Sequence, residues 1–409
     1  MDTFVYKDHK KLRCGYTTGT CAALAAQGAV RFLLTGSWKE TEEIMTPKGI
    51  PVCVSLEEKT SGDSWAECAV RKDAGDDYDV TNGILVYARA EFVKDKNFYE
   101  KVQMSHLESS GFGATGEKPG LSPENQKQQK KANAAHQKEA LPESLVRIDG
   151  GIGIGRITKS GLDQPIGAAA INSVPRKMIR DAVYELLEEA GELRLVSITI
   201  SVPAGVEAAK KTFNPVLGIE GGISVLGTSG IVEPMSEEAL VETIRTHLNV
   251  LKAEGRKWVI AVPGNMGAGF LERYLVEHGK FCTDAHQGSN AADTDAAVEA
   301  EQMAYGELST GTEPSLLEGF MNSLVTMSNF VGKTIDLAAE LGFSGILIAG
   351  HMGKLVKIGN GIMNTHSREA DGRMDTMLSC ALSAGTEDLE LLRKIQRSNT
   401  TDEAMDHLK

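Results

Sequence analysis

Apolar residues follow two different patterns along this chain of 409 residues. In the first half, segments 52–56, 64–74 and 83–93 alternate apolar and polar residues and are rich in β-branched side chains, which indicates strands. In the second half, segments 256–279 and 336–358 each contain a continuous apolar run that a glycine turn joins to helical sequence. Such runs are typical of a parallel sheet covered on both faces. The pattern predicts an α/β protein, with an α+β N-terminal domain and a Rossmann-like three-layer α/β C-terminal domain.

The domain boundaries follow from changes in the same pattern. We expect a mixed α+β domain over 1–236, a Rossmann-like domain over 237–372, and a C-terminal helical segment over 373–409 that packs back on the body. A polar insertion near 95–143 interrupts the first domain. Its residues 126–138 hold four Gln and four Lys with no branched or aromatic side chain, so they have little to bury.

Two further elements are predicted between the insertion and the second domain. Pro175 is expected to start a helix with apolar residues at helical spacing, and Gly191 to end it. A strand is expected within 193–205.

The composition excludes several classes of function. The formal net charge of −13 argues against a nucleic-acid partner, because binding phosphates requires a basic field. No run of about 18 apolar residues occurs, and the first residues lack the apolar stretch of a secretory signal, so we expect a cytoplasmic protein without a membrane partner. Six cysteines without CxxC or CxxH spacing argue against a zinc site, and no metal site is expected.

Any anionic ligand must meet local groups of cations in so acidic a chain. Three such groups are Lys10, Lys11 and Arg13; Arg176, Lys177 and Arg180; and Lys354 and Lys357. A run of charges taken alone is more often a solvated surface than a binding site.

The stretch GYTTGTCAALAAQGA, residues 15–29, places three threonines and two glycines directly before a helix made largely of alanine. Hydroxyl groups and free N–H groups at a helix start can accept an anion, and bare alanines let a large ligand lie close. A threonine-capped helix that packs tightly on a sheet needs small residues for the same steric reason. The sequence leaves both interpretations open.

Two glycine-rich motifs resemble nucleotide-binding loops without meeting their requirements. GGIGIGR, residues 150–156, is followed by strand and turn sequence, whereas a dinucleotide fingerprint requires a helix there. GISVLGTS, residues 222–229, has Thr228 where a Walker A loop requires lysine. Both motifs remain compatible with a bulky ligand or with a glycine-rich sheet edge.

Two other glycine turns follow predicted buried strands, where open α/β sheets bind ligands. VPGNMGAG, residues 262–269, contains Asn265, and AGHMGKLVK, residues 349–357, contains His351 and Lys354. If the two strands are neighbours, both turns line one crevice. The alternative is a pair of tight turns without a ligand.

The segment GIMNTHSREADGR, residues 361–373, concentrates polar side chains with little apolar content to explain them. Polar loops on rigid scaffolds often carry function. His366 is a candidate base, although a lone histidine is more often a capped structural side chain.

Seven segments, in chain order and over nearly the whole chain, together resemble one family, the cobalt-precorrin-5B C1-methyltransferases (CbiD) of anaerobic cobalamin biosynthesis. They are LRCGYTTGTCAALAAQGAV, GIGIGRITKSGL, AINSVPRKMI, TFNPVLGIEGGISVLGTSGIVEPMSE, GNMG, SNFVG and GHMGKLVKIGNGIMNTHSREADGR. The polar segment near 95–143 is longer than the family needs. The resemblance implies methyl transfer from S-adenosyl-L-methionine to C1 of cobalt-precorrin-5B, giving cobalt-precorrin-6A, with cobalt present only as part of the substrate.

This implied activity assigns roles to the candidate residues. For the donor they are Gly264, Asn265, Gly267, His351 and Gly353, and for the carboxylate-fringed corrin they are Arg13, Tyr16, Thr17, Thr18, Thr20, Arg176 and Lys354. His366 is the first choice for a base that removes a proton from the methylated ring, with Asp371 as its orienting carboxylate. The sequence does not reveal the oligomeric state, and a homo-oligomer stays open. The rival functions are a non-catalytic tetrapyrrole carrier and a nucleotide-binding kinase.

Overall fold

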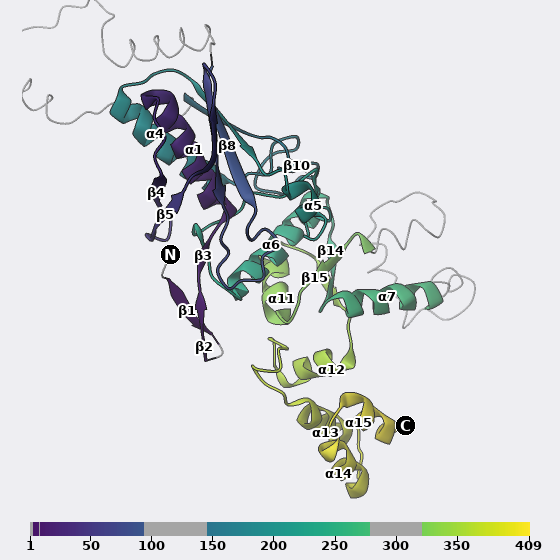
Figure 1. Ribbon diagram of the computed structural model, residues 1–409. Helices are drawn as coiled ribbons and strands as arrows, with labels where there is room; N and C mark the ends of the chain where they lie inside the picture. Colours follow the sequence, from purple (N-terminus) through teal and green to yellow (C-terminus); the bar gives the residue numbers. More distant parts are fainter. Residues whose placement is uncertain (1–2, 8, 94–144, 279–320) are drawn as a thin grey trace, which may run out of the picture. The chain divides into compact units, whose positions relative to one another are not determined.

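The computed structural model of the chain describes residues 3–7, 9–93, 145–278 and 321–409 (Figure 1). They contain helices and mixed sheets, which confirms the predicted α/β class. Two compact units are present: unit 1, Met1–Thr158 with Asp163–Met235, and unit 2, Lys159–Leu162 with Ser236–Lys409. The expected insertion near 95–143 lies outside the described residues, and the three expected domain ranges stay predictions. None of the described helices has the length and apolar content to cross a membrane.

Unit 1 combines short strands with two long helices. Its strands are β1 (Phe4–Lys7), β2 (Lys10–Arg13), β3 (Gly15–Tyr16), β4 (Thr41–Met45), β5 (Pro51–Ser55), β6 (Glu57–Ser61), β7 (Trp65–Arg71), β8 (Leu85–Phe92), β9 (Val146–Gly150), β10 (Arg156–Ile157), β11 (Val196–Ser201), β12 (Ile219–Glu220) and β13 (Ile231–Val232). Its helices are α1 (Thr18–Thr35), α4 (Ser173–Ala190) and α5 (Gly205–Ala209).

A five-stranded mixed sheet in the order β6-β7-β8-β11-β9 forms the centre of unit 1. The strands predicted within 64–74, 83–93 and 193–205 are β7, β8 and β11, so these predictions are confirmed. β11 runs antiparallel to β8 and parallel to β9. The strand predicted over 52–56 is β5, which pairs with β4 in a separate hairpin.

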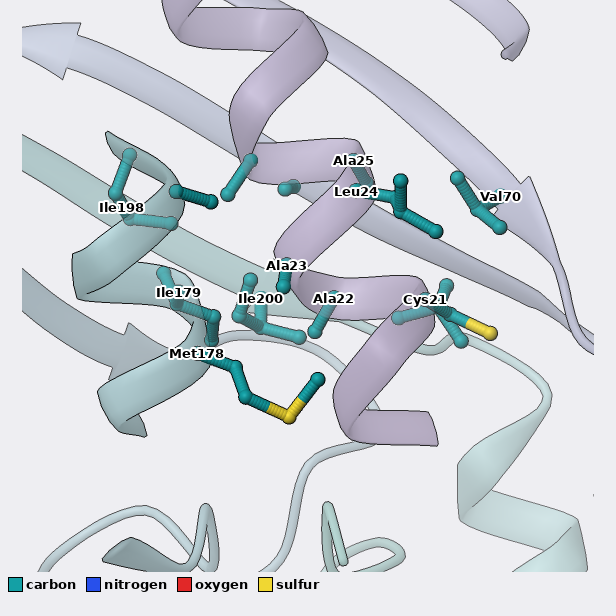
Figure 2. Close-up of a cluster of buried hydrophobic side chains, with 14 of the residues drawn as sticks. Cys21, Ala22, Ala23, Leu24, Ala25, Val70, Met178, Ile179, Ile198 and Ile200 are labelled. Carbon is teal, nitrogen blue, oxygen red and sulfur yellow. The ribbon is translucent and has the colours of Figure 1, made fainter. Parts of the chain in front are cut away.

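Helix α1 lies in the core of unit 1 rather than on its surface. Every residue from Thr18 to Val30 is buried, against β7, β8 and α4. Figure 2 shows Ala22 and Ala23 among the apolar side chains of α4 and the sheet. An added Cβ at Gly28 would lie only 2.5 Å from Leu56 Cδ1. The small residues of α1 are therefore required by close packing, as the tightly packed, threonine-capped alternative predicts.

The sequence predicted one end of helix α4 correctly and the other end two residues too late. It ends, as expected, at Gly191, whose φ of 62° gives the left-handed C-cap. It begins at Ser173 rather than at Pro175. The first turn of a helix tolerates proline because its N–H groups have no acceptor within the helix.

The glycines of residues 150–156 allow backbones to approach one another. Gly153 has φ of 76°, and an added Cβ would lie 1.7 Å from the carbonyl oxygen of Val202. Added Cβ atoms at Gly205 and Gly222 would lie 2.4 and 2.2 Å from the carbonyl oxygen of Gly153. Strand β10, and not a helix, begins at Arg156, the last residue of the motif, so the expectation that the motif is not a dinucleotide fingerprint is confirmed.

Unit 2 alternates strands and helices before a run of short helices. Its elements are α6 (Glu237–Ala253), β14 (Trp258–Val262), α7 (Asn265–His278), β15 (Leu324–Thr326), α11 (Val331–Glu340), β16 (Gly345–Ile348), α12 (Met352–Leu355), the 3-10 helix η3 (Val356–Asn360), α13 (Arg373–Ser383), α14 (Leu389–Arg397) and α15 (Thr401–Leu408).

The sheet of unit 2 is parallel, in the order β15-β14-β16, and helices cover both of its faces. Val259 and Ala261 of the central strand β14 pack with α6 and α11. The alternate residues Ile260 and Val262 pack with Leu271 of α7. The predicted parallel sheet with two covered faces is therefore confirmed for this unit.

The last three helices share a small apolar core of their own, which includes Met377, Ala381, Ile395 and Ala404. Helix α13 contacts η3, and α15 contacts α12, so this group is joined to the turn that follows β16.

Two glycine substitutions test the packing of residues 150–156. We expect Gly167→Ala to destabilise the protein by about 1 kcal/mol, because Gly167 has φ of 85° but open space where its Cβ would lie. Gly153→Ala combines a similar φ with a backbone clash, so we expect a loss of about 3–5 kcal/mol. Urea unfolding followed by circular dichroism measures both. Equal losses would contradict the close approach of Gly153 and Val202.

Candidate functional site

Three turns meet at one edge of the parallel sheet in unit 2, because all three strands end there. β14 and β16 are neighbours, which fulfils the condition set by the sequence for their turns to lie together. The N–H of Ala349 donates to the carbonyl oxygen of Ala261 over 3.0 Å. An added Cβ at Gly350 would lie 2.7 Å from Pro263 Cδ, so the two turns are in direct contact.

The turn after β14 leaves room beside its backbone. Nothing lies within 4 Å of an added Cβ at Gly264. Asn265 is exposed at the start of α7, where the first N–H groups of a helix have no internal acceptor. Gly267 is buried, and an added Cβ would lie 3.4 Å from the carbonyl oxygen of Ala349. This turn can therefore hold a polar group of a ligand against the helix start.

The turn after β15 was not identified as a site by the sequence, although SNFVG was one of the family segments. Ser328 has φ of 53°, an uncommon left-handed backbone for a residue with a side chain. Asn329 Oδ1 accepts a hydrogen bond of 2.9 Å from Lys354 Nζ. The β15 and β16 turns are thus joined by side chains, and a Ser-Asn pair at a strand end is the signal that could have shown it.

The polar loop of residues 361–373 lies against the β15 turn. The N–H of Thr365 donates to the carbonyl oxygen of Asn329 over 2.9 Å, and that of Gly332 to Met363 over 3.1 Å. Lys357 is 3% exposed, and its Nζ donates to the carbonyl oxygens of Thr365 and Ala370. This buried ammonium group ties the loop at two points, one on either side of His366 in the sequence.

His366 is exposed, and its ring is oriented by its own loop. Its Nδ1 accepts the N–H of Arg368 over 3.2 Å, so the neutral ring carries its proton on Nε2. The predicted orienting carboxylate, Asp371, pairs with Arg373 over 2.5 Å instead. The Arg373 guanidinium holds the pKa of Asp371 below its usual value. Among the described residues, His366 and Asp371 therefore do not form the expected pair.

His351 and Gly353 are engaged by the start of α15. His351 caps α12 by accepting the N–H of Gly353 at Nδ1 over 3.0 Å, and its Nε2 lies 3.8 Å from Asp402 Oδ1. An added Cβ at Gly353 would lie 3.3 Å from Thr401 Oγ1. Both residues thus support the packing of α15 on the turn.

The hydroxyl-rich helix start in unit 1 is satisfied by its own chain. Thr17 Oγ1 caps α1 by accepting the N–H of Thr20, and Thr20 Oγ1 donates to the carbonyl oxygen of Gly230 over 2.6 Å. Thr18 is buried. The hydroxyl of Tyr16 donates to the carbonyl oxygen of Arg71, and burial raises the pKa of Tyr16. These contacts favour capping and packing over anion binding.

The two candidate arginines of unit 1 are also engaged. Arg176 is half-buried and donates to the carbonyl oxygens of Ile171, Ile148 and Ala169. Arg13 forms a two-bond ion pair with Asp73, with distances of 2.5 and 2.8 Å. The bond from Arg13 holds the pKa of Asp73 below its usual value, against the opposing effect of partial burial.

The Arg13–Asp73 pair predicts a pH-dependent contribution to stability. Because the folded-state pKa of Asp73 is depressed, the contribution is complete above its ordinary pKa and is lost as the pH falls through the depressed value. We expect Arg13→Gln to lower the free energy of unfolding by about 0.5–1 kcal/mol at neutral pH, since solvent screens the half-exposed pair. The difference from wild type should shrink below about pH 4.

Urea unfolding between about pH 2 and pH 7 measures this difference. Lys177→Gln, which removes the exposed pair with Asp181, is the matched control and should change stability less. A loss in Arg13→Gln that does not vary with pH would contradict the role assigned to the pair.

Family models match two parts of the chain. A family model described as CbiD matches residues 5–129 and 113–234, and one described as CbiD, C-terminal domain, matches residues 364–409. A solved structure titled as a cobalamin biosynthesis protein (cbiD) from Archaeoglobus fulgidus is 22% identical, covers 90% of this chain and 87% of its own, and has a TM-score of 0.37.

Curated relatives carry one name, cobalt-precorrin-5B C(1)-methyltransferase. The relative from Thermoanaerobacter sp. (strain X514) is 36% identical over 99% of this chain and 85% of its own. The relative from Ruminiclostridium cellulolyticum is 37% identical over 98% and 81%, and that from Clostridioides difficile 35% over 99% and 85%. The resemblance seen in the sequence is confirmed, and the chain belongs to the CbiD family.

Proposed function

We propose that this chain is a cobalt-precorrin-5B C1-methyltransferase of cobalamin biosynthesis, with S-adenosyl-L-methionine as the methyl donor. The observation that carries the proposal is the identity of 36% over 99% of the chain with a relative of that name. A methyltransferase requires a methyl donor. The choice of donor rests on the chemistry of the transfer and on the polar turns at the edge of the unit 2 sheet.

The transfer itself requires little acid or base chemistry from the protein. An electron pair of the macrocycle forms a bond from C1 to the methyl carbon, while the bond from that carbon to sulfur breaks and its pair stays on sulfur. The product is a neutral thioether, S-adenosylhomocysteine. The main contribution of the protein is therefore to align the methyl group with one ring carbon and to exclude water.

The β14 turn is the proposed place for the donor. Its open backbone at Gly264, the amide of Asn265 and the free N–H groups at the start of α7 offer contacts to polar groups of such a ligand. Gly267 keeps the helix start close to the neighbouring turn. His351 is given a smaller part than the sequence suggested, because its ring is engaged by α12 and α15.

For the tetrapyrrole we retain Lys354 as a charged contact and His366 as the base that accepts a proton from the methylated ring. The accepting atom is Nδ1, which must first release the N–H of Arg368. Lys354 is half-buried at the same edge of the sheet, and His366 is exposed in the loop held by Lys357. The contacts proposed from unit 1 are weaker candidates, since Arg13 and Arg176 are already bonded within that unit.

The assignment is tested by incubating the full chain with cobalt-precorrin-5B and donor carrying an isotopically labelled methyl group. We expect one label per turnover, located on C1 by nuclear magnetic resonance and mass spectrometry. Binding of the tetrapyrrole without transfer would favour a carrier, and phosphate release from a nucleotide would favour a kinase. Either result would overturn the proposal.

The base is tested with His366→Gln and, as the matched control in the same unit, His407→Gln. Both histidines are exposed. We expect His366→Gln to lower kcat by about 100-fold with little change in KM, because general-base catalysis typically contributes at least that much. His407→Gln should keep wild-type turnover. A kcat of His366→Gln equal to that of the control would show that His366 is not the base.

A further inference from the structure

Lys354 carries a charge that the protein itself does not balance. Its side chain is half-buried, and its Nζ donates to the neutral amide oxygen of Asn329 over 2.9 Å. Among the described residues, no carboxylate lies within 4.0 Å of this ammonium group. The chain has a net charge of −13, so its sequence contains many acidic residues that could have paired with Lys354. Partly buried charges are normally paired, so this one is available to a ligand.

A second ammonium group reinforces the positive character of this edge. Lys357 is 3% exposed, and its ammonium group donates to the carbonyl oxygens of Thr365 and Ala370. No carboxylate of the described chain lies within ion-pair distance of it either. The hydrogen bond from Arg373 and, to a smaller extent, the charge of Lys357 hold the pKa of Asp371 below its usual value. Through its bond to Thr365, whose N–H donates to the carbonyl oxygen of Asn329, Lys357 is also connected to the β15 turn.

The conformation of the chain around Asn329 is fixed by a left-handed residue and by a backbone hydrogen bond. The left-handed backbone of Ser328, with φ of 53°, stores strain where the turn begins. The carbonyl oxygen of Asn329 accepts the N–H of Thr365, which is 3% exposed and whose Oγ1 has no partner in the described part of the chain. A strained residue and an unsatisfied buried hydroxyl are independent marks of a functional site.

The hydrogen bond between Lys354 and Asn329 also determines which N–H donors of the two side chains can bind a ligand. Because Asn329 Oδ1 accepts from Lys354 Nζ, the other end of the amide is Nδ2, with two N–H donors. Lys354 keeps two further N–H donors on its ammonium group. Two neighbouring donor groups, one of them charged, match the two oxygens of a carboxylate.

We propose that Lys354 and Asn329 form a carboxylate-binding subsite at the edge of the unit 2 sheet. The inference rests on the proposed function, whose two reactants both carry carboxylates: the amino-acid end of the donor and the acidic side chains of the tetrapyrrole. Either carboxylate satisfies the geometry, so the experiment must distinguish the two sources.

The test uses Lys354→Met, Asn329→Asp and the control Lys333→Met in the full chain. Asn329→Asp keeps the backbone bond to Thr365 but places a negative charge beside Lys354, so it should repel a carboxylate. Lys333 is exposed on α11, and its substitution removes the same charge from the same unit. The probes are S-adenosylhomocysteine, its decarboxylated form and cobalt-precorrin-5B. Calorimetry measures the binding of all three, and initial rates give KM for the third.

If the donor supplies the carboxylate, both variants should bind S-adenosylhomocysteine about 10- to 100-fold more weakly than wild type, while the decarboxylated form binds all proteins alike. If the tetrapyrrole supplies it, binding of S-adenosylhomocysteine is unchanged and KM for cobalt-precorrin-5B rises by about the same factor, with kcat retained. Affinities and KM values within threefold of Lys333→Met for both reactants would overturn the subsite.

Circular dichroism shows whether each variant folds. If Lys354→Met does not fold, the measurements on Asn329→Asp decide whether the subsite exists. Failure of the proposed function can be distinguished from failure of the subsite. Wild-type protein that binds both reactants without methyl transfer would overturn the methyltransferase assignment, while the binding measurements would still decide the subsite. Wild-type protein that binds neither reactant would overturn both.

Discussion

The candidate site depends on the parallel arrangement of β14, β15 and β16. Parallel strands end at a common edge, so three turns that are far apart in sequence become neighbours. The covered faces of the sheet fix the strands, and the free edge can then hold polar groups in a defined arrangement. Reversal of one strand would remove its turn from this edge.

In unit 1 the main constraint is the close packing of helix α1. Its helix α1 is enclosed on several sides, so the buried stretch Thr18–Val30 consists largely of small residues and the hydroxyl groups at its start are used within the chain. A long stretch of small residues is therefore explained by packing alone. Here the distinctive sequence marks a helix that packs closely against other segments of the same chain.

The sequence predicted the fold class, the parallel sheet and the strand-end turns, because periodicity and glycine punctuation depend on neighbours along the chain. It could not predict which side chains meet across the edge. The bond from Lys354 to Asn329 and the pairing of Asp371 with Arg373 depend on distances between turns and on competition between acceptors. The role of Lys357 was hidden for another reason, since a lysine in a polar segment normally indicates exposure.

Helix α15 contacts the turn after β16 through Thr401 and Asp402. During synthesis, β16 and its turn leave the ribosome well before these two residues. The sheet can thus form while the His351 turn still lacks its contacts with α15. The contacts that α15 makes with His351 and Gly353 can therefore form only after synthesis of the segments that make up the sheet.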